Sequence, residues 1–538
     1  MTDSDTHRAI DAIAETAVMK HEAGTPVQAQ RPTGPSQAQR ASSAWIGPND
    51  PRYPDLVGKQ FNKRYRGTPD YVCLVGSTQQ VVDAVQDAVR AELRVVARSG
   101  GHCLEGFVAD PGVRLVIDTS LMTGVYYDPD MGAFAVECGA TLGETYRKLF
   151  LGWGVTLPAG ESPDIGVGGH VLGGAFGFLC REHGLAADHL YAVEVVVVDE
   201  AGSVRSVIAT REALDPNRDL WWAHTGAGGG NFGVVTRYWF RSPGAMGTDP
   251  AWLLPRAPDS ITTLRVAWNW EDLDEAAFTR LVDNFGTWCE RHSDAGSPYA
   301  RLFSTLFLHR RQLGTLELKA LSTAGADAER LLDEHLDAIN DGLGVPHTRQ
   351  VERSSWLAFA LNPFPEIFRA GAENALFKGK DAFLRKAFSK RQLAVAHHYL
   401  TRTDHDVPGG MLGLATYGGK INTVAPDATA SVQRDSILST ACLAGWQDAS
   451  AEAPALAWVR ALYSDMFADT GGVPAPGEAC DGAMINHPDV DLADPDLNTS
   501  GVPWHTLYYK DNYPRLQSVK ARWDPRNVFH HALSIRAT

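Results

Sequence analysis

The sequence has 538 residues, which is too long for a single compact core and favours two lobes or domains that share an interface. Hydrophobic residues make up 44% and charged residues 21%, as in ordinary globular proteins, so the composition predicts a folded enzyme. The formal net charge of -15, without any concentrated basic stripe, opposes a phosphate backbone and argues against nucleic acid as a partner.

The sequence also argues against membrane insertion and against a cysteine framework. No apolar run reaches the roughly 18 residues needed to cross a bilayer, and residues 1–24 lack the apolar stretch of a secretory signal. We therefore expect a cytoplasmic protein without a membrane partner. The 7 cysteines are widely spaced and contain no CxxC pair, so we expect neither a disulfide framework nor a metal site.

In chain order, residues 1–45 are rich in Gln, Pro, Thr and Ser, and we expect a flexible tail there. The next segments predict a strand at 71–75, a helix at 79–92 and a second strand at 93–98, from a change between strand and helical periodicity. Residues 133–154 repeat the pattern of a strand followed by a helix. Residues 192–207 predict a hairpin that turns at Glu200–Gly202.

Beyond Pro243 the density of glycine falls and longer periodic segments appear. A strand at 261–270 precedes a helix at 274–292, and two strands within 301–323 precede a helix at 326–340. Adjacent strands between helices indicate an antiparallel sheet with helices on one face. We expect a first domain at 46–248, a second at 249–492, and a C-terminal segment, 493–538, that returns to the first.

Three glycine-rich segments lie in the first domain, at 98–102, 166–177 and 226–233. Glycine tolerates positive φ and close backbone approach, so successive N–H groups can converge on an anion such as a diphosphate. None of the segments has the spacing of a Rossmann or P-loop motif. A single cluster could equally be a set of tight turns; three clusters in one domain favour binding.

Four segments together resemble the berberine bridge enzyme-like FAD-linked oxidases. They are VVARSGGHCLEGF, LPAGESPDIGVGGHVLGGAFGFLCREHGLAADHL, DLWWAHTGAGGGNFGVVT and YYKDNYPRLQSVKARWDPRNVFHHALSI, in the order and spacing of the family. The resemblance implies an α+β fold, similar to vanillyl-alcohol oxidase, with a two-subdomain FAD-binding domain. It also implies a substrate domain built on an antiparallel sheet flanked by helices.

The resemblance implies that FAD is bonded covalently to His102, the histidine of RSGGH. The alternative is that His102 is only a turn residue. Many bacterial members form a second bond through a cysteine, but Ser162 occupies that position here and its hydroxyl cannot supply a thiolate. We therefore expect attachment through His102 only. Cys103 matches neither linking position and is expected to pack against or line the cofactor pocket.

The resemblance extends to a larger set of positions along the cofactor. The glycines among them have a backbone role, whereas Val235 could also be a core residue. The expected cofactor-binding residues are Arg98, Ser99, Gly100, Gly101, His102, Cys103, Gly139, Gly160, Ser162, Gly166, Gly168, Gly169, His170, Gly173, Gly174, Gly177, Gly233, Val235, Tyr509 and Asn512.

The family's catalytic tyrosines come from a segment that reads GxYINYPD, whereas Met484 and His487 replace them here. Histidine has an unperturbed pKa of about 6.5 and accepts a proton at neutral pH more readily than tyrosine, so His487 is a candidate base. Tyr417 matches a family position whose phenol faces the substrate, and Asn486 is a candidate to orient His487 or the substrate. The alternatives are a wall residue for His487 and a core residue for Tyr417.

These features predict an FAD-dependent oxidase that dehydrogenates a hydroxyl group of a sugar or secondary metabolite. The expected small-molecule partners are the substrate and O2, which would leave as H2O2. Two alternatives remain at this point: an oxidative cyclase that uses the same flavin, and a flavin-binding protein without turnover.

Overall fold

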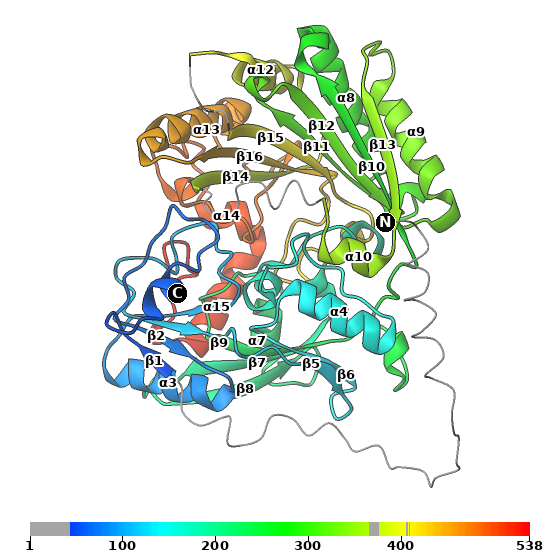
Figure 1. The fold of residues 1–538 in the computed structure, drawn as a ribbon. Coiled ribbons are helices and arrows are strands. Elements are labelled where there is room, and N and C mark those ends of the chain that lie inside the picture. Colours follow the sequence, from blue (N-terminus) through cyan, green and yellow to red (C-terminus); the bar gives the residue numbers. More distant parts are fainter. Residues whose placement is uncertain (1–43, 365–375, 405–406, 408) are drawn as a thin grey trace, which may run out of the picture. The chain divides into compact units, whose positions relative to one another are not determined.

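The computed structural model describes residues 44–364, 376–404, 407 and 409–538 (Figure 1). The predicted tail at 1–45 lies outside the described residues except for its last two, Ala44 and Trp45. Both belong to strand β1 (Ala44–Ile46).

The first sheet has four strands in the order β1-β2-β4-β3. Strands β2 (Tyr71–Leu74), β4 (Leu115–Asp118) and β3 (Val95–Arg98) run parallel, and β1 pairs antiparallel with β2. Helix α3 (Thr78–Arg90) connects β2 to β3, is capped by Ser77 and buries a face of valines and alanines. The predicted unit of strand, helix and strand is confirmed.

The second sheet is antiparallel and has the order β5-β6-β9-β7-β8. Its strands are β5 (Val125–Asp128), β6 (Ala133–Glu137), β7 (Leu190–Val198), β8 (Val204–Thr210) and β9 (Val234–Phe240). Strands β7 and β8 form the predicted hairpin. Helix α4 (Leu142–Trp153) follows β6, as predicted, and begins with a capping box formed by Thr141 and Glu144.

The third sheet is antiparallel and has eight strands in the order β13-β10-β12-β11-β15-β16-β14-β17. The strands are β10 (Ile261–Asn269), β11 (Leu302–His309), β12 (Thr315–Ser322), β13 (Thr348–Ser354), β14 (Leu376–Leu384), β15 (Gly409–Thr416), β16 (Leu438–Trp446) and β17 (Cys480–Gly482).

Four helices cover one face of the third sheet: α8 (Glu275–His292), α9 (Ala328–Asn340), α12 (Lys390–Thr401) and α13 (Glu452–Met466) (Figure 1). Along β11, Leu306 and Leu308 are buried, while the alternating residues Thr305, Phe307 and His309 are partly accessible. This alternation is that of a strand with one buried face. The predicted antiparallel sheet with helices on one face is confirmed.

The C-terminal segment packs against the first half of the chain. Helix α15 (Tyr513–Trp523) contacts α7 (Arg218–Ala223), and α14 (Trp504–Tyr509) precedes it. The ammonium of Lys520 donates to the carbonyl of Asn231 at 2.7 Å, within the third glycine-rich segment. The domain boundaries expected at 248 and 492 stay predictions.

Two further observations concern only the described parts of the chain. No helix there is long and apolar enough to cross a membrane. No group of three or more His, Cys, Asp or Glu residues there is arranged to hold a metal ion.

Candidate functional site

The loop Arg98–His102 begins where β3 ends and is fixed at its start by a buried ion pair. Arg98 Nη2 lies 2.7 Å from Asp118 Oδ2, and both side chains are almost completely buried. Ser99 Oγ donates to the carbonyl of Cys138 at 2.6 Å. Arg98 and Ser99 thus hold the point at which the backbone leaves the sheet.

The first two glycine-rich loops cross at Gly100 and Gly166. A Cβ on Gly100 would lie 2.4 Å from Gly166 N, and one on Gly166 would lie 2.2 Å from Gly100 N. Gly101 has φ +82°, and its Cβ would lie 2.7 Å from the carbonyl oxygen of Lys59. This crossing of backbones requires glycine at these positions.

Four consecutive N–H groups on this loop lack a protein acceptor. Within the described ranges, no hydrogen bond takes the backbone N–H of Ser99, Gly100, Gly101 or His102. Runs of N–H groups of this kind are anion-binding sites. The first glycine-rich loop therefore has unused donors, as expected of a loop that contacts a cofactor.

The His102 imidazole is held by stacking. Its ring lies against the Phe61 ring with centroids 4.7 Å apart and an interplanar angle of 10°. Neither ring nitrogen has a hydrogen-bond partner among the described residues. Burial and the positive charge of Lys59 lower the pKa of His102 to about 4, against the opposing effect of Asp164. The imidazole is therefore neutral at pH 7.

The second loop contains helix α5 (Val167–His170). A Cβ on Gly168 would lie 2.5 Å from the carbonyl oxygen of Cys138, whereas one on Gly169 would meet nothing within 4 Å. His170 Nε2 is buried without a hydrogen-bond partner among the described residues, and burial lowers the pKa of His170 to about 3. Gly169 thus faces open space, and His170 contributes a buried nitrogen that is available for a ligand.

Three segments converge around His170. A Cβ on Gly160 would lie 2.6 Å from His170 Nε2. Asn486 Nδ2 donates to the carbonyl of His170 at 2.9 Å, and Asn486 Oδ1 accepts from Ala175 N at 3.1 Å. Asn486 also lies 2.4 Å from the Cβ that Gly173 lacks. Asn486 therefore joins the segment that carries His487 to the second glycine-rich loop.

Other predicted cofactor residues lie close to backbone oxygens of the protein itself. A Cβ on Gly139, Gly177 or Gly233 would lie 1.8, 2.1 or 2.4 Å from a carbonyl oxygen, and Gly174 has φ +110°. Val235 is a buried residue of β9. These positions shape the backbone around the loops.

Two predicted residues of the C-terminal segment tie other loops together. Tyr509 Oη donates to the carbonyl of Ala227 at 2.9 Å. Asn512 Nδ2 donates to the carbonyls of Pro426 and Thr429 at 2.9 and 3.1 Å. Both residues therefore stabilise the third glycine-rich segment and its surroundings.

The two residues of interest for a second bond to FAD differ in chemistry. Ser162 is half-buried and has only a hydroxyl group. Cys103 follows His102 directly, and burial raises the pKa of its thiol to about 11. Since a thiolate is the nucleophilic form of cysteine, this raised pKa keeps Cys103 mainly in its less nucleophilic thiol form at neutral pH.

His487 is hydrogen-bonded to a buried carboxylate. His487 Nδ1 lies 3.3 Å from Asp381 Oδ2, and 48% of the His487 side chain is accessible against 5% for Asp381. Asp381 Oδ2 also accepts from Met484 N at 3.2 Å. The surrounding protein disfavours charge on the imidazole, but the hydrogen bond and charge of Asp381 outweigh this effect and raise the pKa of His487.

Glu161 is a second titratable group near His487. Burial raises the pKa of the Glu161 carboxyl to about 7, and the charge of His487 opposes this shift. Glu161 in turn contributes to the raised pKa of His487. Glu161 lies within the second of the four resembling segments, between Gly160 and Ser162, but the resemblance gives it no role; Asp381 lies outside all four segments.

Tyr417 is completely buried. Its hydroxyl donates to the carbonyl of Gln433 at 3.1 Å, and burial raises the pKa of the phenol. The ring packs against Phe176 and Phe383, with centroids 4.8 and 5.0 Å away, in a cluster that also contains Met484. Tyr417 therefore lies behind the segment that carries His487.

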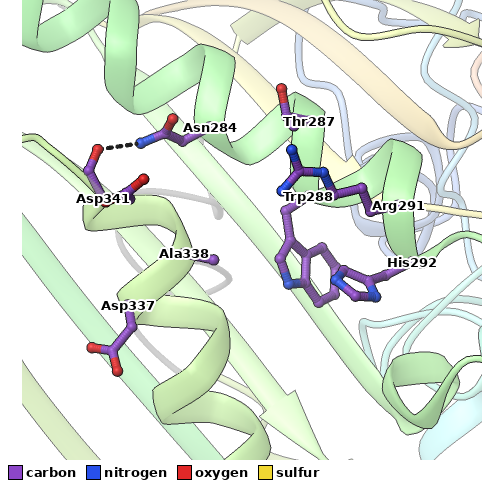
Figure 2. Close-up of a pocket in the computed structure, with 8 residues that line it drawn as sticks. All are labelled: Asn284, Thr287, Trp288, Arg291, His292, Asp337, Ala338 and Asp341. Atoms are coloured by element: carbon purple, nitrogen blue, oxygen red, sulfur yellow. Dashed lines mark hydrogen bonds between the residues drawn. The ribbon is translucent and has the colours of Figure 1, made fainter.

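A surface hollow elsewhere is separate from this site. It lies between α8 and α9 and is lined by Trp288, Arg291 and His292 on one side and Asp337 on the other (Figure 2). None of the residues expected at the cofactor lines it. The candidate active site is instead the cluster around His102 and His487, because it holds the backbone N–H groups without acceptors and the unbonded His170 Nε2 among the described residues.

The residues present fit FAD. A run of free N–H groups suits its diphosphate or the carbonyl oxygens of its ring, and His102 offers an unbonded, neutral nitrogen. Residues 69–207 match the model of the FAD binding domain family, and residues 483–536 match the model described as "Berberine and berberine like". Together with the fold, these matches define an FAD-linked oxidoreductase.

Known relatives specify the family. The chain is 54% identical over 488 residues to the aclacinomycin-N/aclacinomycin-A oxidase of Streptomyces galilaeus, covering 90% of this chain and 88% of the relative. A crystal structure of aclacinomycin oxidoreductase has a TM-score of 0.90 and 53% identity, over 93% of this chain and 100% of the other. A glycopeptide hexose oxidase complexed with teicoplanin has a TM-score of 0.88 and 49% identity, over 92% and 99%. The protein belongs to the berberine bridge enzyme-like FAD-linked oxidases, as the four sequence segments predicted.

Proposed function

We propose that the protein oxidises a hydroxyl group of a sugar, or of a glycosylated secondary metabolite, to a carbonyl group and passes the electrons to O2, forming H2O2. The substrate class is drawn from the aclacinomycin oxidase and the glycopeptide hexose oxidase that the chain resembles. The observation that carries the proposal is the His487–Asp381 hydrogen bond beside the cofactor loops.

In this proposal His487 is the base that removes the hydroxyl proton. When Nδ1 donates to Asp381, Nε2 keeps the lone pair that accepts a proton. Asp381 then stabilises the imidazolium and fixes the tautomer, as a buried carboxylate does for other catalytic histidines. FAD, when bound, supplies the two-electron acceptor. Met484 N and Asn486 hold the His487 segment in place.

We also propose that FAD is attached through His102 only. The absence of a hydrogen bond on either His102 nitrogen among the described residues, and its lowered pKa, support this assignment because a neutral imidazole is the nucleophilic form. Ser162 has no thiol for a second bond. The remaining predicted cofactor residues would act through their backbone N–H groups or by close approach.

The function is tested by mixing the purified yellow protein with glycosylated natural products and simple sugars in the absence of oxygen. A substrate should bleach the visible flavin absorbance, and admission of O2 should restore it with one H2O2 per substrate oxidised. Absence of bleaching across both groups of compounds would contradict the proposal and favour a flavin-binding protein without turnover.

The attachment is tested by acid precipitation of the wild-type protein. Flavin should stay with the precipitate and with the tryptic peptide that contains His102. His102→Ala should release all its flavin into the supernatant, whereas Ser162→Ala should behave like the wild type. Flavin mass on a peptide that lacks His102 would overturn the assignment.

A further inference from the structure

The segment Lys59–Asn62 forms hydrogen bonds with the RSGGH loop and the residues after it, on both sides of His102. Phe61 N donates to the carbonyl of Gly101 at 2.9 Å. Lys59 Nζ donates to the carbonyl of Ser99 at 3.1 Å, and Asn62 Nδ2 donates to the carbonyl of Leu104 at 2.9 Å. The backbone therefore has a fixed position before and after the histidine.

The same segment sets the orientation of the His102 ring. The Phe61 ring lies nearly parallel to the imidazole, with centroids 4.7 Å apart. Phe61 is itself braced by the edge of Phe377, whose ring centroid is 5.6 Å away, and Asn62 Nδ2 donates to the Phe377 carbonyl at 3.0 Å. Because neither imidazole nitrogen has a hydrogen-bond partner among the described residues, stacking is what holds this ring.

This way of holding a histidine leaves both nitrogens available for a new bond. A histidine fixed by a hydrogen bond commits one nitrogen to donate or accept. Stacking fixes the plane of the ring and uses neither nitrogen. A reaction in which nitrogen must meet a carbon at a defined angle gains rate from such prior orientation.

We propose that Phe61 is a positioning residue for the covalent attachment of FAD, and that Lys59, Phe61 and Asn62 form an attachment clamp around His102. This inference rests on the proposed His102 bond. In the reaction, a bond forms between an imidazole nitrogen and the 8α carbon of the flavin, while one C–H bond of the methyl group and the imidazole N–H are broken. The two electrons pass to the flavin ring and then to O2, which leaves with two protons as H2O2.

Charge on the clamp agrees with this role. Lys59 is held 3.5 Å from Asp118 and its positive charge acts on His102 in the direction that keeps the imidazole unprotonated. Among the neighbouring charged groups, Asp164 favours protonation of His102, Arg98 lowers the pKa of Lys59, and positive charge on His102 lowers the pKa of His170. The nucleophilic form of His102 is therefore favoured at neutral pH.

The test compares Phe61→Leu with the conservative variant Phe61→Tyr in the full-length protein. Cells are sampled at intervals after induction, and flavin per protein is measured before and after acid precipitation. Phe61→Leu should contain as much total flavin as the wild type but acquire acid-stable flavin roughly 10- to 100-fold more slowly, since a misoriented reactant loses rate on this scale. Phe61→Tyr should restore the wild-type rate.

A matched control is Phe307→Leu on β11, because the Phe307 ring also stacks on a histidine. The ring centroids of Phe307 and His309 lie 6.1 Å apart, with an interplanar angle of 9°. Phe307→Leu should leave the rate of attachment unchanged. If Phe61→Leu attaches flavin at the wild-type rate, or if it only loses total flavin without a change in the acid-stable fraction, Phe61 is a packing residue and the inference is wrong. If the wild type itself holds no acid-stable flavin, the His102 bond fails instead.

Discussion

At the scale of single residues, His487 stands where the family has a tyrosine, and its hydrogen bond and raised pKa depend on Asp381. Asp381 lies on β14 and hydrogen-bonds the imidazole from a buried position. A histidine without such a carboxylate would lose its proton partner and its fixed tautomer. The pair Asp381 and His487 should therefore be considered as one acid–base unit.

Removal of His487, the proposed base, should slow the reaction with substrate. His487→Phe is expected to reduce the rate of anaerobic flavin bleaching by about 10²-fold or more, the usual scale for loss of a general base. The FAD content should stay at the wild-type level because His487 makes no contact with the RSGGH loop in the described hydrogen bonds. An unchanged rate of bleaching would remove His487 from the mechanism.

Asp381→Asn should move the pH profile in a defined direction. Asp381 raises the pKa of His487, and the base must be unprotonated, so kcat/KM of the wild type should rise with pH through that raised pKa. In the variant the pKa falls, so the acidic limb should shift to lower pH while the plateau decreases. A limb that stays in place would show that another group, with Glu161 as the first candidate, controls it.

Substitutions of two glycines in the second loop should differ in their effects on protein stability and on FAD binding. Gly166→Ala places a Cβ 2.2 Å from Gly100 N, so the variant should lose thermal stability as well as FAD. Gly169→Ala meets nothing within 4 Å and should keep the stability of the protein portion while it binds FAD more weakly. Thermal unfolding and flavin content measure the two effects; equal losses of stability in both variants would contradict this distinction.

At the scale of elements, local residue patterns were sufficient to predict α3, α4 and the β7–β8 hairpin. Residues close in sequence stabilise each of them, as the N-cap Ser77 of α3 and the capping box at Thr141 of α4 show. Strand β14, in contrast, depends on residues that are distant in sequence. Its sequence LFKGKDAFL places Lys378, Lys380 and Asp381 in a buried strand, which is acceptable only because carboxylates from distant segments neutralise the lysines.

The residues of the candidate site are likewise of two kinds, those that a local motif predicts and those that only the fold brings to the site. The RSGGH and GVGGH motifs predicted His102 and the glycine-rich loops from adjacent residues. Phe61 and Asp381 reach the site from separate segments through stacking and hydrogen bonding, and no local pattern marks them. Their identification required the fold.

The capping box offers a test at this scale. Thr141 Oγ1 accepts from Glu144 N at 3.2 Å, and Glu144 Oε2 accepts from Thr141 N at 2.9 Å. Thr141→Ala should lower the free energy of unfolding by ~1 kcal/mol, seen as a lower midpoint of urea denaturation. Thr141→Ser keeps the acceptor and should retain most of the stability; an equal loss in both variants would assign the effect to the methyl group.

At the scale of the whole described molecule, a buried cluster of charges joins the first half of the chain to the third sheet. Lys378 contacts Glu105 and lies 2.7 Å from Asp489, and Lys380 lies 2.5 Å from Asp489 and 2.9 Å from Asp491. All five side chains are almost completely buried. Buried pairs of this kind become costly when one partner is removed.

Lys378→Met should therefore destabilise the protein by about 3–5 kcal/mol, because Glu105 and Asp489 would be left buried beside an apolar side chain. Lys386→Met is the matched control, since Lys386 pairs with Glu478 on the surface and should change stability little. Differential scanning calorimetry of both variants gives the comparison. A similar melting temperature for the two would show that the cluster adds no stability.

The same cluster has a consequence for biosynthesis. Glu105 lies three positions after His102, and its carboxylate accepts from Val490 N, 385 positions further along the chain, at 3.4 Å. A ribosome must therefore release nearly the whole polypeptide before the N-terminal loop and the segment carrying His487 can meet. Nascent or prematurely terminated chains that end before Val490 therefore lack the hydrogen bond that joins the His102 loop to the segment after His487.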